Sequence, residues 1–200
     1  MTRVLSITLA TLVLLLAGMA SAGEWDVGLT AGAKSINAHV NHKTYLHNGY
    51  FRIGGSGVYM DDDPEKYKWG SLDFTVGSDT LVPGLNVDVG LRGLVGSAED
   101  RRHSGDFGAV AFTGGAEYYF PPRMMPIPLE LFSRLTWAPS PLCFMDGDQF
   151  LEVTAGVGIR IMSMASIRLS YTAHRLDFDS GPGSWDLKDD AFRVGIVMRF

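Results

Sequence analysis

The sequence predicts a closed antiparallel β-barrel that spans a membrane, with ten strands, or eight as the alternative. Three observations lead to this prediction. Apolar and polar residues alternate with a period of two over almost the whole chain after Gly23, as they do in strands with one apolar face. Short and long connections between these segments alternate along the chain. An apolar leader precedes the alternating region.

The leader has the organisation of a secretory signal peptide. Arg3 supplies a positive charge, an apolar run extends from Val4 to Leu16, and Ala20-Ser21-Ala22 matches a small-residue cleavage site. The run is too short for a membrane-spanning helix, which needs roughly 20 apolar residues. We therefore expect residues 1–22 to be a cleaved signal peptide and residues 23–200 to form one outer-membrane barrel domain.

Composition narrows the function classes. The formal net charge of -5 gives no reason to expect a nucleic-acid partner. Cys143 is the only cysteine, so an exported chain of this kind has no internal disulfide framework. Average hydropathy would suit a soluble protein, but alternation along membrane-spanning strands averages the apolar signal away. No motif in the sequence calls for a cofactor.

Alternation is clearest in the second half of the chain. Period-two segments run from Leu85 to Val95, Val110 to Phe120, Leu129 to Trp137, Leu151 to Ile161, Ile167 to Ala173 and Phe192 to Phe200. The first half is noisier. It suggests strands near 48–60 and 67–77, and either two short strands or one bent strand over 24–32 and 36–42.

The connections predict how the barrel is oriented. Those near 43–49, 78–84, 121–126 and 162–165 are short. Those near 61–68, 97–106, 138–149 and 178–190 are longer, polar and mostly acidic. Short turns at one end and long loops at the other are typical of outer-membrane barrels. With both chain ends in the periplasm, all the long loops would lie outside the cell.

Aromatic residues lie near the ends of the expected strands. Rings with one polar edge favour the headgroup level of a bilayer, so this placement indicates two aromatic girdles. The residues concerned are Tyr50, Phe51, Tyr59, Tyr67, Trp69, Tyr118, Phe120, Trp137, Phe150, Phe178 and Phe192.

The polar face of the strands carries charges in mid-strand, and its basic members are all arginines. The planar guanidinium group pairs with carboxylates through two parallel bonds, which suits a packed interior. We therefore expect the apolar face to contact lipid and the charged face to line a narrow lumen that side chains largely fill. The predicted lumen-lining residues are Arg52, Asp73, Asp88, Arg92, Glu117, Glu130, Arg134, Glu152, Arg160, Arg168, His174 and Arg193.

The second half of the chain resembles a known family. The stretches GGAEYYF, SRLTWAPSPL, LEVTAGVGIRIMSMASIRLSYTAHRLDF and FRVGIVMRF are similar to the YfaZ-type family of outer-membrane β-barrels from Gram-negative bacteria. The resemblance covers much of residues 107–200. It implies the barrel fold and the outer-membrane location, and it implies no catalytic residues.

Two groups of residues are candidates for chemical sites. His39, His42 and His47 could hold a transition metal, but 39 and 42 have opposite parity on a strand and converge only if the backbone bends. His174, with Asp177 and Ser180, could belong to a lipid-modifying or proteolytic enzyme at the barrel rim. We favour structural roles for both groups, as interfacial or turn histidines in the first and as part of the lumen network for His174. The sequence therefore predicts no catalytic and no metal-binding residues.

Three functions remain open. The first is a non-enzymatic barrel, either structural or a narrow pore for small solutes. The second is the rim enzyme around His174, and the third is a surface module that binds through the acidic loops. The expected partners are outer-membrane lipid, lipopolysaccharide and the barrel-insertion machinery. Phe192 and the terminal Phe200 resemble the aromatic signal that this machinery reads.

Overall fold

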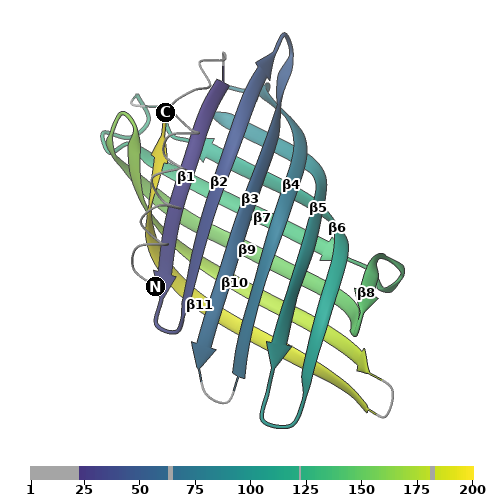
Figure 1. Cartoon of the computed structure of the whole chain (residues 1–200). Helices are drawn as coiled ribbons and strands as arrows, with labels where there is room; N and C mark the ends of the chain where they lie inside the picture. Colours follow the sequence, from purple (N-terminus) through teal and green to yellow (C-terminus); the bar gives the residue numbers. More distant parts are fainter. Residues whose placement is uncertain (1–22, 63–64, 122, 181–182) are drawn as a thin grey trace, which may run out of the picture.

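The structure is a computed structural model, and it describes residues 23–62, 65–121, 123–180 and 183–200. The predicted signal peptide, residues 1–22, lies outside the described residues. Almost every described residue belongs to a strand or to a connection between two strands (Figure 1). Among the described residues, no helix has the length and apolarity needed to cross a membrane.

In the described part of the chain, eleven strands form one antiparallel sheet, and ten of them close into a barrel. The ten are β1 (Gly23–Gly32), β2 (Ser35–Leu46), β3 (Gly49–Asp62), β4 (Glu65–Val82), β5 (Leu85–Glu99), β6 (Ser104–Tyr119), β7 (Leu129–Ala138), β9 (Gly147–Met162), β10 (Ala165–Ser180) and β11 (Gly183–Arg199). The short β8 (Cys143–Met145) follows the 3-10 helix η1 (Ser140–Leu142) and pairs with β6 beyond the end of β7.

The barrel closes where β1 pairs with β11, from Asp26 opposite Arg199 to Gly32 opposite Arg193. Closure matters because an open sheet edge in lipid would leave backbone N–H and C=O groups without partners. The predicted closed barrel with ten strands is therefore confirmed. The pattern over 24–42 resolves into two strands, β1 and β2, rather than one bent strand.

The two ends of the barrel differ. We call the end that carries Gly23 and Phe200 the terminal end, where Trp25 and Phe200 exchange two backbone hydrogen bonds. We call the opposite end, at the lower side of Figure 1, the hairpin end, because the β3–β4, β5–β6 and β10–β11 hairpins extend there.

Most of the long loops predicted at the hairpin end are strands. Residues 61–62, 65–68, 97–99, 104–106 and 183–190 all pair in the sheet. Strands such as β4 and β11 thus continue well past the part of the barrel that has an apolar exterior. The prediction was wrong because polar outward-facing residues were interpreted as loop residues.

Over the terminal half of the barrel, which we call the embedded section, apolar side chains face outward. Leu72, Phe74 and Val76 on β4 are exposed, while Asp73 and Thr75 between them are buried. The closing strand follows the same pattern, with Phe192, Val194, Ile196, Met198 and Phe200 exposed. An apolar exterior around a closed sheet is the design of a barrel that spans the bacterial outer membrane.

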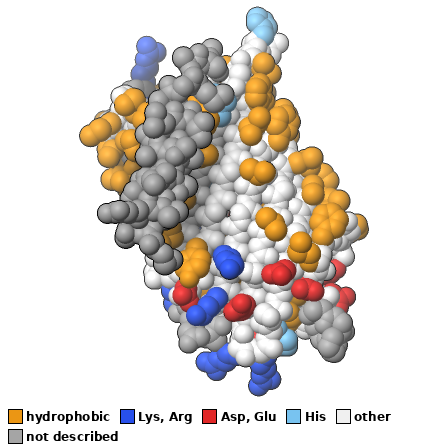
Figure 2. Space-filling model, in the orientation of Figure 1, with side chains coloured by type: hydrophobic (Ala, Val, Ile, Leu, Met, Phe, Trp, Pro, Cys, Tyr) orange, Lys and Arg blue, Asp and Glu red, His pale blue; other side chains and the backbone are white. Residues whose placement is uncertain are grey.

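Beyond the embedded section, the same alternate positions of each strand still face inward and outward, but the inward side chains become apolar and the outward ones polar. On β10, Leu176 and Phe178 are buried inside, while Arg175 and Asp179 face outward and are exposed. Figure 2 shows the consequence, since acidic and basic side chains gather at the hairpin end and leave the wall above it apolar. We call this part the projecting section. On its strands it extends to the hairpin end from Val58, Trp69, Leu94, Ala109, Phe150, Leu176 and Leu187 inclusive.

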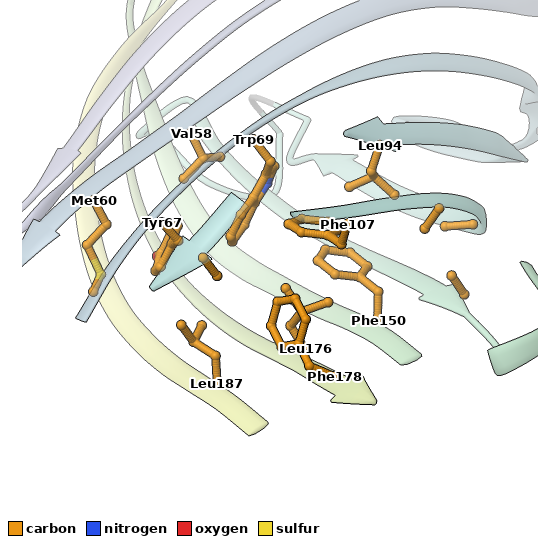
Figure 3. Close-up of a cluster of buried hydrophobic side chains, with 14 of the residues drawn as sticks. Val58, Met60, Tyr67, Trp69, Leu94, Phe107, Phe150, Leu176, Phe178 and Leu187 are labelled. Atoms are coloured by element: carbon orange, nitrogen blue, oxygen red, sulfur yellow. The ribbon is translucent and has the colours of Figure 1, made fainter. Parts of the chain in front are cut away.

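The projecting section contains the main hydrophobic core of the barrel (Figure 3). We call this core the plug. Its larger members come from seven strands and converge on the barrel axis: Val58, Met60, Tyr67, Trp69, Leu94, Phe107, Phe150, Leu176, Phe178, Trp185 and Leu187. Tyr67, Trp69, Phe150 and Phe178 were predicted to form lipid-facing girdles. They are inside instead, because the strands at this level have water outside them and an interior to fill.

Candidate functional site

Within the embedded section, an ion-pair network connects strands that are distant in sequence. Its deepest member is Arg92 on β5. Arg92 Nε donates to Asp73 on the neighbouring β4, and its Nη1 donates to Glu152 Oε1 on β9 at 2.7 Å. The other oxygen of Glu152 lies 3.3 Å from His174 Nδ1. One guanidinium group therefore links β4 and β5 to β9 across the lumen, on the side of the plug that faces the terminal end.

A second cluster surrounds Glu130 on β7, nearer the terminal end. Arg168 Nε donates to Glu130 at 2.6 Å, and Arg168 Nη2 donates to Glu117 at 2.9 Å. Arg199 donates to the second oxygen of Glu130 at 3.3 Å. Only 2% of Glu130 is exposed, and two cations balance its charge. Such a buried carboxylate is tolerated because its oxygens are paired.

Asp88 on β5, like Glu130, is one carboxylate between two guanidinium groups, which is the reverse of the arrangement around Arg92. Arg52 Nη2 lies 2.8 Å from Asp88 Oδ1, and Arg134 Nη2 lies 3.4 Å from the same atom. Gly115 leaves room for this contact, since a Cβ there would lie 3.1 Å from Arg134 Nη2.

Arg193 on β11 lies between the network and the plug, and only 2% of it is exposed. Its guanidinium group donates to Ser35 Oγ at 2.9 Å and to the Tyr67 hydroxyl at 3.4 Å. Tyr67 in turn donates to Asp189 at 2.5 Å. Among the described residues no carboxylate reaches Arg193 within ion-pair distance, so the tyrosine hydroxyl connects the two charges.

A cavity of about 420 Å³, which we call the chamber, occupies the centre of the embedded section. Near its deep end it is lined by Ser56, Asp73, Arg92 and Glu152. At the terminal end it reaches Ser163, which lies in the connection between β9 and β10. The chamber is therefore a polar space that opens at the terminal end.

Two cations at the mouth of the chamber lie against aromatic rings. Lys43 Nζ lies 3.8 Å from the centre of the Tyr50 ring, and the Arg160 guanidinium lies 5.2 Å from the centre of the Tyr119 ring. Neither cation has a carboxylate within ion-pair distance in the described part of the chain. Cation–π contacts hold such groups in place without neutralising them.

The plug closes the other side of the chamber. Tyr67 and Trp69 stack with their ring centres 4.4 Å apart, and the Trp69 ring lies 4.9 Å from that of His174 at the boundary with the ion pairs. Further out, Phe178 and Trp185 stack at 4.1 Å. No plug residue is among the described residues that line the chamber. The lumen thus consists of a polar chamber and an apolar plug in series.

At the hairpin end, the 100–103 connection lies against the outer surface of the plug. The His103 ring stacks on Trp185 with the ring centres 5.7 Å apart. Asp100 fixes this turn by accepting hydrogen bonds from the backbone N–H groups of Arg102 and His103 at 2.6 and 3.0 Å. These hydrogen bonds hold the pKa of Asp100 below its usual value.

Every residue of the predicted lumen-lining set lies on the inner wall of the barrel. Most are buried in the ion-pair network, while Arg160 lies at the exposed mouth. The prediction did not include Glu24, Asp26 or Lys43, which also line the chamber. A parity count along β1 and β2 would have found these three, but the alternation of apolar residues there is weak.

The histidines considered as a metal site do not converge. His39 faces the lumen and is paired with Asp26 at 2.9 Å. His42 faces outward, where its ring lies 4.5 Å from that of Trp25, and His47 is exposed in the β2–β3 connection. Among the described residues, no group of three or more His, Cys, Asp and Glu is placed to hold a metal ion.

The other candidate sites also change. His174 is 3% exposed inside the barrel, where the lumen-lining prediction placed it, and not at the rim that the alternative enzyme hypothesis requires. Asp177 has the opposite parity on β10 and pairs with the outward-facing Arg175. Cys143 is half-buried beside the plug, with its thiol directed to the Ala138 carbonyl at 3.8 Å. The acidic residues expected in loops are mostly outward-facing strand residues of the projecting section.

No protein-family model and no curated protein matches the chain. Among solved structures, the chain is similar to the NanC porin, with 11% identity over 88% of this chain and 99% of that one and a TM-score of 0.43. It is also similar to OmpT, an outer-membrane protein of Vibrio cholerae, with 10% identity over 91% of this chain and 62% of that one and a TM-score of 0.42. The fold assignment rests on the strand pairing of this chain, not on these distant similarities.

Proposed function

We propose that the protein is a narrow outer-membrane pore for small polar solutes, and that the plug holds it closed in the present structure. The observation that carries this proposal is the position of the chamber, which is coaxial with the plug and open at the terminal end. A barrel with a purely structural role would have no need for a polar space of about 420 Å³ in the membrane.

The lining of the chamber suits a solute that is itself polar. Charges of both signs alternate around its wall, and the ion pairs hold most of these side chains in fixed positions. A fixed polar lining can replace the hydration of a small solute without large rearrangement. The plug is apolar and continuous, so passage requires its side chains to move aside.

Orientation and partners follow from the same proposal. The terminal end would face the periplasm and the charged projecting section would lie outside, at the level of the lipopolysaccharide headgroups. Membership of the YfaZ-type family remains a proposal that rests on the sequence stretches given above. We also propose that the insertion machinery reads the closing strand, so deletion of Phe200 should lower the assembled fraction more than Phe192→Ala does.

Planar-bilayer recording tests the pore directly. The wild-type barrel should be silent or open rarely, whereas the double variant Trp69→Ala/Phe150→Ala should pass a steady small-ion current through the emptied plug. The matched control is Leu72→Ala/Phe74→Ala, which removes lipid-facing bulk from the same barrel and should remain silent.

The proposal depends on the variant being folded. Heat-dependent migration on a gel distinguishes folded barrels from unfolded ones, since a folded barrel migrates faster before boiling. A folded double variant that stays silent would overturn the pore and leave a sealed structural barrel.

A further inference from the structure

From the geometry around Asp88, we infer that the chamber contains a binding subsite for a small organic anion. The inferred ligand carries a carboxylate or phosphate group, which Arg52 and Arg134 bind together. The inference rests on the proposed function in one respect, because it names the class of solute that the chamber would hold.

The first argument is the local balance of charge. Arg52 and Arg134 come from β3 and β7, on different sides of β5, and both reach the same oxygen of Asp88. In the neighbouring cluster the arrangement is reversed, because Arg92 forms ion pairs with two carboxylates, Asp73 and Glu152. Among the described residues, Asp88 is therefore the one carboxylate that Arg52 and Arg134 contact, because the nearby Asp73 and Glu152 are hydrogen-bonded to Arg92, and all of these groups line the chamber.

The second argument is the number of unused donors. A guanidinium group carries five N–H donors. Among the described residues, Arg52 makes one side-chain contact, with Asp88, and Arg134 makes two, with Asp88 and with Thr113 Oγ1 at 3.4 Å. Most donors of the two groups therefore have no protein partner among the described residues, and both side chains line the chamber. Planar guanidinium groups bind carboxylate and phosphate oxygens through paired hydrogen bonds.

The third argument is access. The two arginines border a chamber that is open at the terminal end, where its lining includes Lys43 and Arg160 together with Glu24. An anion that enters therefore finds cations that no described carboxylate contacts at the mouth and the two arginines further inside. Asn86, two residues from Asp88 on β5, adds an amide to the same wall.

Isothermal titration calorimetry on the detergent-solubilised barrel tests the subsite. The probes are succinate, glucose 6-phosphate, glucose and putrescine, which supply a carboxylate, a phosphate, no charge and positive charge. We expect saturable binding of succinate, glucose 6-phosphate or both, and none of glucose or putrescine. The two anions separate the carboxylate from the phosphate source.

Variants locate the binding. Arg134→Gln leaves Arg52 and Asp88 as a one-to-one pair, so the barrel should fold, and we expect anion affinity to fall at least tenfold, which is about 1.4 kcal/mol. Asp88→Asn removes the competing carboxylate and should tighten anion binding severalfold, which a merely structural role would not produce. Arg175→Gln, on the outer face of β10, is the control and should bind as the wild type does.

The inference fails if the folded wild type shows no saturable binding of either anion, or if Arg52→Gln and Arg134→Gln both keep wild-type affinity. Its failure is distinguishable from failure of the pore. If the wild type binds an anion but the folded variant Trp69→Ala/Phe150→Ala passes no current, only the proposed pore is contradicted. If that variant passes current but the wild type binds neither anion, only the subsite is contradicted.

Discussion

The embedded and projecting sections are built from the same strands with opposite polarity. On β10, Leu169 faces outward and Arg168 inward in the embedded section. Six residues further along the same strand, Arg175 faces outward and Leu176 inward. The backbone period is two in both sections, so the strand itself does not change. What changes is the medium outside the barrel, from lipid to water.

This difference decides what each interior can hold. In lipid the outer wall takes the apolar side chains, so the interior receives the polar ones and must pair them. In water the outer wall is polar, and the interior fills with aromatic and aliphatic side chains as in a soluble protein. The chamber and the plug are therefore two results of one rule applied in two media.

The largest expected effect comes from breaking the buried pairing of the embedded section. Glu130→Ala leaves Arg168 and Arg199 without their common partner, and we expect the barrel to lose about 3–5 kcal/mol of stability. Urea unfolding in lipid vesicles measures this loss. A change of less than about 1 kcal/mol would mean that these charges are hydrated, as for exposed pairs.

The matching change in the projecting section acts by loss of packing. Leu176→Ala should cost about 2–5 kcal/mol locally, because the side chain is 1% exposed and its removal leaves a void. Hydrogen exchange should accelerate at the hairpin ends of β10 and β11 and stay slow near the terminal end. Uniform acceleration along both strands would contradict the division into two sections.

Substitution of two outward-facing residues of β10 tests whether lipid surrounds the embedded section and water the projecting section. Leu169→Arg places a charge in lipid and should cost about 2–4 kcal/mol if the residue lies near the bilayer midplane. Arg175→Leu places an apolar group in water and should have little effect on assembly. The fraction of heat-modifiable barrel in membranes reports both, and equal losses would show that the membrane boundary is misplaced.

The smallest effect concerns the connection that covers the plug. The pKa of Asp100 is lowered because the backbone N–H groups of Arg102 and His103 donate to its carboxylate. The stabilisation is therefore present above the unfolded pKa of about 3.9 and is lost as the pH falls through the lower folded value. Hydrogen exchange of the Arg102 and His103 amides, corrected for intrinsic rates, should therefore accelerate as the pH falls through this range. The Asp100→Asn variant should show no such pH-dependent acceleration.

Period-two alternation was enough to predict the barrel, its even strand count and the parity of the lumen residues. The plug could not be predicted in this way, because Trp185 and Leu187 share the parity of Arg193. With apolar residues expected outside, residues 178–190 do not fit the strand pattern and are therefore predicted as a loop. The pairing of lumen charges also lies beyond a single sequence, since it depends on the stagger around the barrel. Arg168, for example, pairs with Glu117, which is 51 positions away.

The central claim is that the lumen opens at the terminal end and is sealed at the hairpin end. Ser56→Cys, in a Cys143→Ser background, places a thiol in the chamber with minimal change of volume. Ser184→Cys places one on the exposed outer face of the β10–β11 hairpin and reports the orientation of each vesicle population.

Labelling by a membrane-impermeant methanethiosulfonate reagent in sealed vesicles is the most direct measurement. The account predicts that the Ser56→Cys thiol reacts when the terminal end faces the reagent. It also predicts that the thiol stays unmodified when the hairpin end faces the reagent, until the vesicles are opened. Equal rates from both sides would contradict it.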